Sequence, residues 1–212
     1  MAAWKTTQIH EIDEITDGRV PWRPVRFHFG IESFGINVFN GKAAGDRLIN
    51  EHDEVDDEQE ELYFVHSGRA RFELDGETLD AGPGTFVYAE PGVKRTAFAE
   101  EPNTNLIALG GVPGKAYETH GWEIWAPLQP LYQAGEYEQV ADRGRELVSE
   151  HPTYAHLAYN VACCESLAGR TQDAIEHLRL ALAKAADLRR LAAEDSDLDP
   201  LRGEPAFREL MG

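Results

Sequence analysis

The chain is poor in cysteine, with Cys163 and Cys164 as the only two among 212 residues. They are adjacent within a helical pattern, where neighbouring side chains point about 100° apart, so a disulfide between them would be strained. We therefore expect two buried, reduced thiols and no structural disulfide. Reduced thiols are typical of a reducing compartment, and we predict a cytoplasmic protein.

Positive charge is also scarce, because 20 Lys and Arg stand against 38 Asp and Glu, a formal net charge of −18. Nucleic acids and anionic membrane surfaces are recognised by clustered basic side chains, so we expect neither as a partner. No segment approaches the roughly 20 apolar residues that span a bilayer. The opening stretch MAAWKTTQIHEIDEITDG lacks the basic start and apolar run of a signal peptide.

Short extended runs bounded by glycine and proline dominate residues 25–116. The pair Asp75-Gly76 is a strong hairpin signal, because glycine tolerates the positive φ of a tight turn. Eight or more strands without intervening helices predict an antiparallel sandwich or barrel of the jelly-roll kind. The expected strands are VRFHF, FGINVF, RLINE, LYFVHS, RARFELD, ETLDAGPG, TFVYAE, VKRTAFA and NLIALGG.

An N-terminal arm is predicted over residues 1–24, ahead of these strands. Ile9, Ile12 and Ile15 have helical spacing, and two prolines then stop any helix. We expect the apolar face of this arm to pack on its own domain.

Residues 117–212 are predicted to be helical, because Ala, Leu, Glu and Arg take over and apolar positions recur at three and four. The stretches LYQAGEYEQVADRGRELVSEHP and ESLAGRTQDAIEHLRLALAKAA superimpose at a shift of 34, with Gly135 on Gly169 and Val140 on Ala174. A repeat of this length with a helix-turn-helix in each copy is typical of a solenoid.

The segment NVACCESLAGRTQDAIEHLRLAL resembles the tetratricopeptide repeat, with Gly169 in the turn and the small residues Ala162 and Ala174 where two helices approach closely. The resemblance covers about residues 120–212, including a C-terminal cap. It implies a module that binds a protein partner or supports a dimer. The alternative is that two copies and a cap only pack against the first domain, because an array needs about three repeats for stability.

Residues 34–111 resemble the cupin superfamily. Glu61 stands seven residues before Gly68, as the first cupin motif requires, and FVYAEPGVKR follows the second motif through Pro91 and Gly92. The resemblance implies an antiparallel β-barrel, the double-stranded β-helix or jelly roll, that forms a homodimer. The predicted fold class is thus α+β multidomain, a cupin-like barrel followed by an α-helical tetratricopeptide-like domain.

The metal ligands that the cupin resemblance implies are only partly present. The histidine of the second motif falls on Arg95, which has no lone pair for a metal. Counting forward from Gly45 with one extra residue, the first motif lands on His52 and Glu54, which with Glu61 form a one-histidine, two-carboxylate set for a divalent metal. Counting back from Glu61 instead, the two histidine places fall on Val55 and Asp57 or on Glu54 and Asp56.

A ligand site is predicted in the lumen, where Glu61 and Arg95 face each other if both point inward. A guanidinium can replace the charge of a metal and pair with the carboxylate through two parallel hydrogen bonds. Tyr63 shares the face of Glu61, because side chains alternate along a strand. Phe86 and Tyr88 share one face of their own strand and complete the predicted ligand-binding set, with core packing as the alternative for these aromatics.

Three functions remain open from the sequence. The first, which we favour, is a non-enzymatic small-molecule-binding or regulatory protein without a cofactor, in which Arg95 anchors an anion. The second is a metal-dependent cupin enzyme, an isomerase or dioxygenase, that uses His52, Glu54 and Glu61. The third is a scaffold with an inert barrel whose helical half binds a protein. We favour the first because a fixed cation stands where a histidine ligand is expected.

Overall fold

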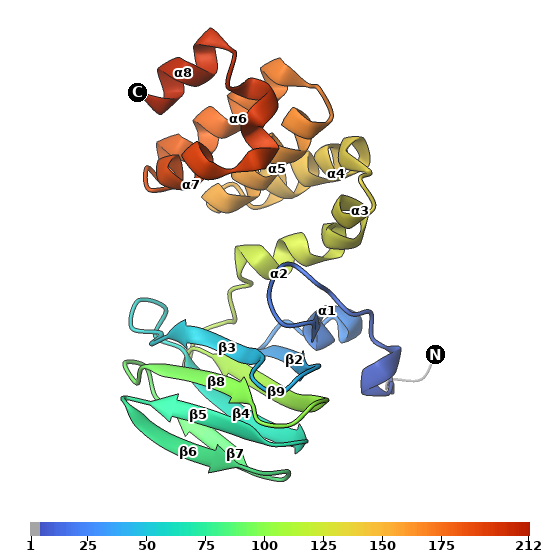
Figure 1. Ribbon diagram of the computed structural model, residues 1–212, viewed down its shortest axis with the longest axis vertical. Coiled ribbons are helices and arrows are strands. Elements are labelled where there is room, and N and C mark those ends of the chain that lie inside the picture. Colours follow the sequence, from blue (N-terminus) through green and yellow to red (C-terminus); the bar gives the residue numbers. More distant parts are fainter. Residues whose placement is uncertain (1–4) are drawn as a thin grey trace. The chain divides into compact units, whose positions relative to one another are not determined.

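The computed structural model describes residues 5–212 and divides into two compact units, Met1–Thr119 and His120–Gly212 (Figure 1). The first four residues of the predicted arm lie outside the described residues. The first unit contains the 3-10 helix η1 (Ile9–Glu11), the helix α1 (Val25–Phe29) and the strands β1 (Trp22–Arg23), β2 (Gly35–Gly41), β3 (Arg47–His52), β4 (Glu60–Ser67), β5 (Ala70–Leu74), β6 (Glu77–Ala81), β7 (Phe86–Ala89), β8 (Arg95–Ala99) and β9 (Thr104–Gly111).

Two antiparallel sheets form this unit, with strand orders β1-β2-β9-β4-β7 and β3-β8-β5-β6. Figure 1 shows them as two separate layers. The prediction of an antiparallel barrel or sandwich of the jelly-roll kind is confirmed, and its two sheets are not closed into one continuous barrel. The connection from β2 to β3 carries the chain from one sheet to the other, so no ladder of hydrogen bonds joins the sheets there.

The core of the first unit lies between the two sheets. Alternate side chains of each strand point inward, as the pleat of a strand requires. The fully buried members include Tyr63 and Val65 from β4, Phe72 from β5, Ala97 from β8 and Leu106 from β9. A side chain that continues one of these inward rows therefore reaches the space between the sheets.

The segment Val25–Phe29, expected as a strand, is the short helix α1. Pro24 precedes it, and Gly30 ends it in the left-handed conformation with φ 71°, where its N–H donates to the carbonyls of Arg26 and Phe27. A run of five residues is too short for its apolar period to separate helix from strand.

The N-terminal arm differs from the expected helix. Its described part, residues 5–24, contains the single helical turn η1, after which Ile12 and Ile15 are buried and Ile15 forms a bridge to Trp22. The strand β1 then pairs with β2 and extends the five-stranded sheet. The arm thus packs on its own domain through strand pairing.

The second unit is helical throughout. None of the helices among the described residues has the length and hydropathy needed to cross a membrane. The elements are α2 (Gly121–Trp125), η2 (Ala126–Leu128), α3 (Gln129–Gln133), α4 (Tyr137–Glu150), α5 (Ala155–Leu167), α6 (Thr171–Lys184), α7 (Leu188–Glu194), η3 (Ser196–Leu201) and α8 (Pro205–Met211).

The expected repeat of 34 residues is visible in these bounds. Helix α4 starts and ends 34 residues before α6, and the series α2–η2–α3 covers positions 121–133 against 155–167 in α5. The first copy is interrupted at Pro127 and Pro130, which each lack a backbone N–H. Gly135 and Gly169 both turn the chain with positive φ, 77° and 76°. The two cysteines are buried and free, as expected.

Candidate functional site

One carboxylate oxygen, Oε2 of Glu61, lies at the centre of a polar cluster between the two sheets. It is 3.0 Å from Nε2 of His52 and accepts a hydrogen bond of 3.1 Å from Nε of Arg95. The hydroxyl of Tyr63 donates to the same oxygen. Glu61 and Tyr63 come from β4 in one sheet, whereas His52 and Arg95 are cross-strand partners on β3 and β8 in the other. The cluster therefore joins the two layers.

The ring of His52 has a defined proton arrangement. Its Nδ1 lies 2.7 Å from the backbone carbonyl of Asn50, which can only accept, so Nδ1 carries a hydrogen. Its Nε2 faces two carboxylates, Oε2 of Glu61 at 3.0 Å and Oε1 of Glu54 at 3.3 Å. Carboxylates also only accept, so a positive charge belongs at Nε2, either a proton or a metal ion.

Glu54 is brought to this point by a tight turn after β3. Its own φ is 57°, in the left-handed region that a non-glycine residue seldom adopts, and its carbonyl accepts from the N–H of Glu58 at 2.9 Å. The side-chain amide of Gln59 donates to the carboxylate oxygen Oε2 of Glu54 at 3.4 Å. The ligand atoms of His52, Glu54 and Glu61 consequently all lie within 4.8 Å of one another.

Arg95 is the buried cation of the cluster, and its side chain is 0% exposed. Nε donates to Glu61, and Nη1 donates to the carbonyl of Val93 at 2.8 Å. Nη2 is buried without a hydrogen-bond partner among the described residues. The predicted pair of Glu61 and Arg95 is thus present, but through one hydrogen bond instead of two parallel ones.

The electrostatics of the cluster follow from these contacts. Burial acts to lower the pKa of His52, but the hydrogen bonds to Glu61 and Asn50 and the nearby carboxylates raise it above 6.5 overall. Burial acts to raise the pKa of Glu61, whereas hydrogen bonds from His52 and Tyr63 and the charge of Arg95 bring it below 4.5. Burial, and then Glu61, raise the pKa of Tyr63 well above 10. Glu61 is therefore held as an anion and Tyr63 as a neutral donor.

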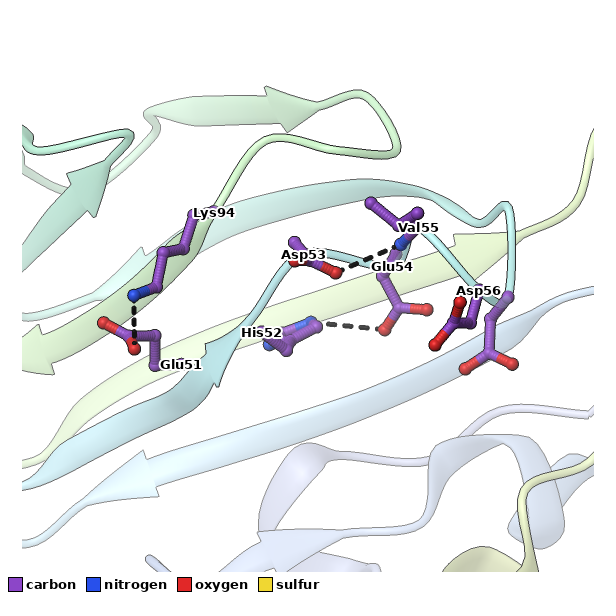
Figure 2. Close-up of a pocket in the computed structure, with 8 residues that line it drawn as sticks. Glu51, His52, Asp53, Glu54, Val55, Asp56 and Lys94 are labelled. Carbon is purple, nitrogen blue, oxygen red and sulfur yellow. Dashed lines mark hydrogen bonds and ion pairs between the residues drawn. The ribbon is translucent and has the colours of Figure 1, made fainter.

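An open depression of about 360 Å³ lies beside His52 and Glu54 (Figure 2). Figure 2 shows the side chains of these two residues facing each other. Among the described residues of the wall, Lys94 is the only other basic side chain, and it is paired with Glu51 at 2.7 Å. The wall is therefore strongly acidic, and it comprises Glu51, His52, Asp53, Glu54, Val55, Asp56, Asp57 and Lys94.

Two of the predicted ligand-binding residues lie elsewhere. Phe86 and Tyr88 are 64% and 52% exposed on the outer face of β7, while Val87 and Ala89 fill the core. The expectation that Phe86 and Tyr88 line the lumen therefore differs from the structure. All four residues of β7 are apolar or aromatic, so their pattern does not show which face of the strand points inward. The hydroxyl of Tyr88 donates to Glu60 at 2.8 Å, on that outer side.

Gly110 lies beside the cluster and was not predicted from the sequence as a site residue. It lies opposite Glu61 on β9, and a Cβ added there would stand 3.2 Å from Oε1 of Gln59 and 3.6 Å from Cγ of Glu61. The glycine therefore avoids a tight contact with the side chain of Gln59, whereas the contact with Glu61 would be an ordinary one. The pair Gly110-Gly111 was the available signal, since a glycine inside a strand often marks a close approach.

A known family model matches part of the first unit. The Cupin domain model matches residues 50–107, which contain all five cluster residues. The helical residues lie outside this match, so their resemblance to the tetratricopeptide repeat stays a prediction. No curated protein matches.

Solved structures similar to the chain include several cupins. A cupin protein from Bacteroides fragilis is 16% identical over 57% of this chain and 93% of its own, with a TM-score of 0.41. A sugar phosphate isomerase of the cupin superfamily from Silicibacter pomeroyi is 15% identical over 50% and 74%, with a TM-score of 0.42. KdgF from a Halomonas species is 22% identical over 48% and 86%, with a TM-score of 0.35.

Proposed function

We propose that the first unit is a divalent-metal-binding cupin domain in which His52, Glu54 and Glu61 hold the ion. The observation that carries this proposal is the convergence of Nε2 of His52 on two carboxylate oxygens at 3.0 and 3.3 Å. Adjacent ligands of a six-coordinate ion with bonds of about 2.1 Å stand about 3 Å apart, so these separations fit. Imidazole with two carboxylates suits Mn²⁺, Fe²⁺ and Zn²⁺.

The surrounding residues support a cation at this place. Metal-ligating histidines usually donate their second ring N–H to a carbonyl or carboxylate, as His52 does to Asn50. Tyr63 and Arg95 hold Glu61 in position, and Gln59 contacts Glu54. The acidic wall of the depression favours the approach of cations. When bound, such an ion polarises an oxygen of a small molecule.

Arg95 opposes the ion, because its fixed positive charge lies 3.1 Å from Oε2 of Glu61. Its charge is, however, already paired with that carboxylate and fully shielded from solvent. The two carboxylates of the set exceed it by one negative charge, which leaves the site attractive to a cation.

Titration of the chelator-treated full-length protein with Mn²⁺ tests the proposal. Mn²⁺ prefers oxygen and imidazole ligands over thiolate, so calorimetry with this ion reports on this site. We expect His52→Ala to abolish binding and the matched control His66→Ala, an exposed histidine on β4, to leave it unchanged. Equal Mn²⁺ affinity in His52→Ala and in the parent, or no binding in either, would overturn the proposal.

A second candidate function is the metal-free binding of a small anion by Arg95. The observation that favours it is the buried Nη2 of Arg95, which has no partner among the described residues and is free to donate to an anionic oxygen. The acidic wall beside His52 and Glu54 places this candidate behind the first, since its carboxylates repel an approaching anion. Stabilisation by inorganic phosphate that persists in chelator and disappears in Arg95→Met would support it.

A further inference from the structure

A second set of ligand atoms converges in the helical unit, far along the chain from the cupin domain. Sγ of Cys163, on α5, and carboxylate oxygens of Asp195 and Asp197, at the junction of α7 and η3, all lie within 4.8 Å of one another. Sγ lies 3.7 Å from Oδ2 of Asp195. Cys163 is buried at 5% exposure, and the two aspartates are partly buried.

Each carboxylate is oriented by a tyrosine from a different helix. The hydroxyl of Tyr159, on α5, donates to Oδ2 of Asp195 at 2.8 Å, and that of Tyr132, on α3, donates to Oδ2 of Asp197 at 2.5 Å. Oδ1 of Asp195 also accepts from the N–H of Asp197 at 3.0 Å. The three candidate metal-ligand side chains are thus held together before any ion arrives, which reduces the conformational entropy lost on metal binding.

The negative charge of this set has no basic counterpart. Among residues 5–212, no Lys, Arg or His side chain forms an ion pair with Asp195 or Asp197. Arg202 lies beside them, but it donates to Asp199 at 2.6 Å and to the backbone carbonyl of Asp195 at 3.0 Å.

An unpaired buried hydroxyl lies on the same face of α5. Cys163 belongs to the stripe that packs against α6 and η3, as do Tyr159 and Ala162. Ser166 is three residues further along and therefore continues this stripe. Its Oγ is buried, with 2% of the residue exposed, and has no hydrogen-bond partner among the described residues. One buried polar group on the stripe of α5 that carries Cys163 is thus left without a hydrogen-bond partner among the described residues.

We propose that Cys163, Asp195 and Asp197 form a zinc-type metal site in the helical unit. A thiolate is a poor ligand for Mg²⁺ and Ca²⁺, whereas two carboxylates do not suit Cu⁺, so the mixed set selects Zn²⁺ or its spectroscopic substitute Co²⁺. On binding, the S–H bond breaks, a sulfur–metal bond forms and the proton passes to solvent, without oxidation or reduction. The site is independent of the proposed cupin metal.

The adjacent cysteine supplies a matched control. Cys164 is also buried, but it packs in the cluster formed with α2 and α4, on another face of the same helix. Replacement of either thiol by alanine removes the same atoms from α5. Only the loss of Cys163 should affect the metal.

The experiment is a Co²⁺ titration of the full-length His52→Ala protein, so that the cupin cluster does not contribute. We expect a saturable sulfur-to-cobalt charge-transfer band. Cys164→Ala should keep this band and Cys163→Ala should lose it. In Tyr132→Phe, the band should need about tenfold higher Co²⁺ concentration. Asp197→Asn, which keeps the shape of the side chain, should also weaken Co²⁺ binding. This variant tests the site independently if Cys163→Ala fails to fold. A band that survives Cys163→Ala, or no band in His52→Ala, would overturn the assignment.

Discussion

At the scale of single residues, Arg95 carries the strongest expectation for stability. It is fully buried and pairs with Glu61, whose side chain is 17% exposed. Removing one partner of a buried pair leaves the other charge uncompensated, at a cost of about 3 kcal/mol. We expect Arg95→Met to lower the free energy of unfolding of the first unit by about that amount, measured by urea unfolding. The loss should not be larger, because Nη2 is already unpaired among the described residues.

A double-mutant cycle separates the pair from general packing. If the loss comes from an uncompensated carboxylate, Arg95→Met combined with Glu61→Gln should cost clearly less than the two single changes added together. Additive costs would show that Arg95 acts through its packing alone.

Alternation along a strand was enough to predict part of the candidate site. It placed Tyr63 beside Glu61, and the cupin spacing brought Arg95 opposite them, as the structure has it. The same reasoning did not locate Phe86 and Tyr88, because β7 is an edge strand with apolar residues on both faces. The motif spacing also predicted the set of His52, Glu54 and Glu61, whose ligand atoms lie within 4.8 Å of one another, but not the left-handed backbone of Glu54 that brings its carboxylate to His52.

At the scale of elements, Gly68 is required where β4 turns into β5. Its φ is 71°, and a Cβ there would clash with Oγ1 of Thr104 and stand 2.7 Å from the backbone Cα of the same residue. Positive φ costs a non-glycine residue about 1 kcal/mol, and a clash with backbone adds about 1 to 3 kcal/mol. We expect Gly68→Ala to destabilise the first unit by about 3 kcal/mol in thermal or urea unfolding.

Gly84 provides the control for this prediction. Its φ is 87°, but nothing lies within 4 Å of an added Cβ. Gly84→Ala should therefore show only the conformational cost of about 1 kcal/mol. Equal losses in the two variants would mean that the approach to Thr104 does not matter.

Most elements were predictable because each strand is bounded by turn residues and the helical repeat is regular. The helices α4 and α6 keep the spacing of 34 residues that the sequence shows. The exception is α1, whose five residues carry no usable period, and whose conformation depends on its flanking Pro24 and Gly30. Closure of the barrel was also unpredictable, since it depends on which strands pair across a connection and not on the pattern within a strand.

At the scale of the whole molecule, both units contain a histidine bound to a carboxylate. In the helical unit, Nδ1 of His177 lies 2.8 Å from Oε2 of Glu165, whose side chain is 0% exposed and also accepts from Nε of Arg145 at 2.6 Å. The hydrogen bond to Glu165 raises the pKa of His177, although burial acts to lower it.

The homodimer and the protein partner expected from the two resemblances stay predictions.

The pH dependence of stability follows from these shifts. His52 and His177 have folded pKa values above 6.5, so their contribution is complete below pH 6.5 and is lost as pH rises through those values. Glu61 has a folded pKa below 4.5, so its contribution is present above pH 4.5 and is lost as pH falls through that value. In chelator, the melting temperature should therefore be highest between pH 4.5 and 6.5.

Comparison of two variants tests whether His177 causes the loss of stability of the helical unit at alkaline pH. In His177→Gln, the unfolding free energy measured from the helical circular dichroism signal should fall less between pH 6.5 and 9 than in the control His156→Gln, an exposed histidine on α5. The neutral amide still bonds to Glu165 but has no charge to lose. If the two variants give the same profile, the decline comes instead from the repulsion of a chain that carries a formal charge of −18 at pH 7.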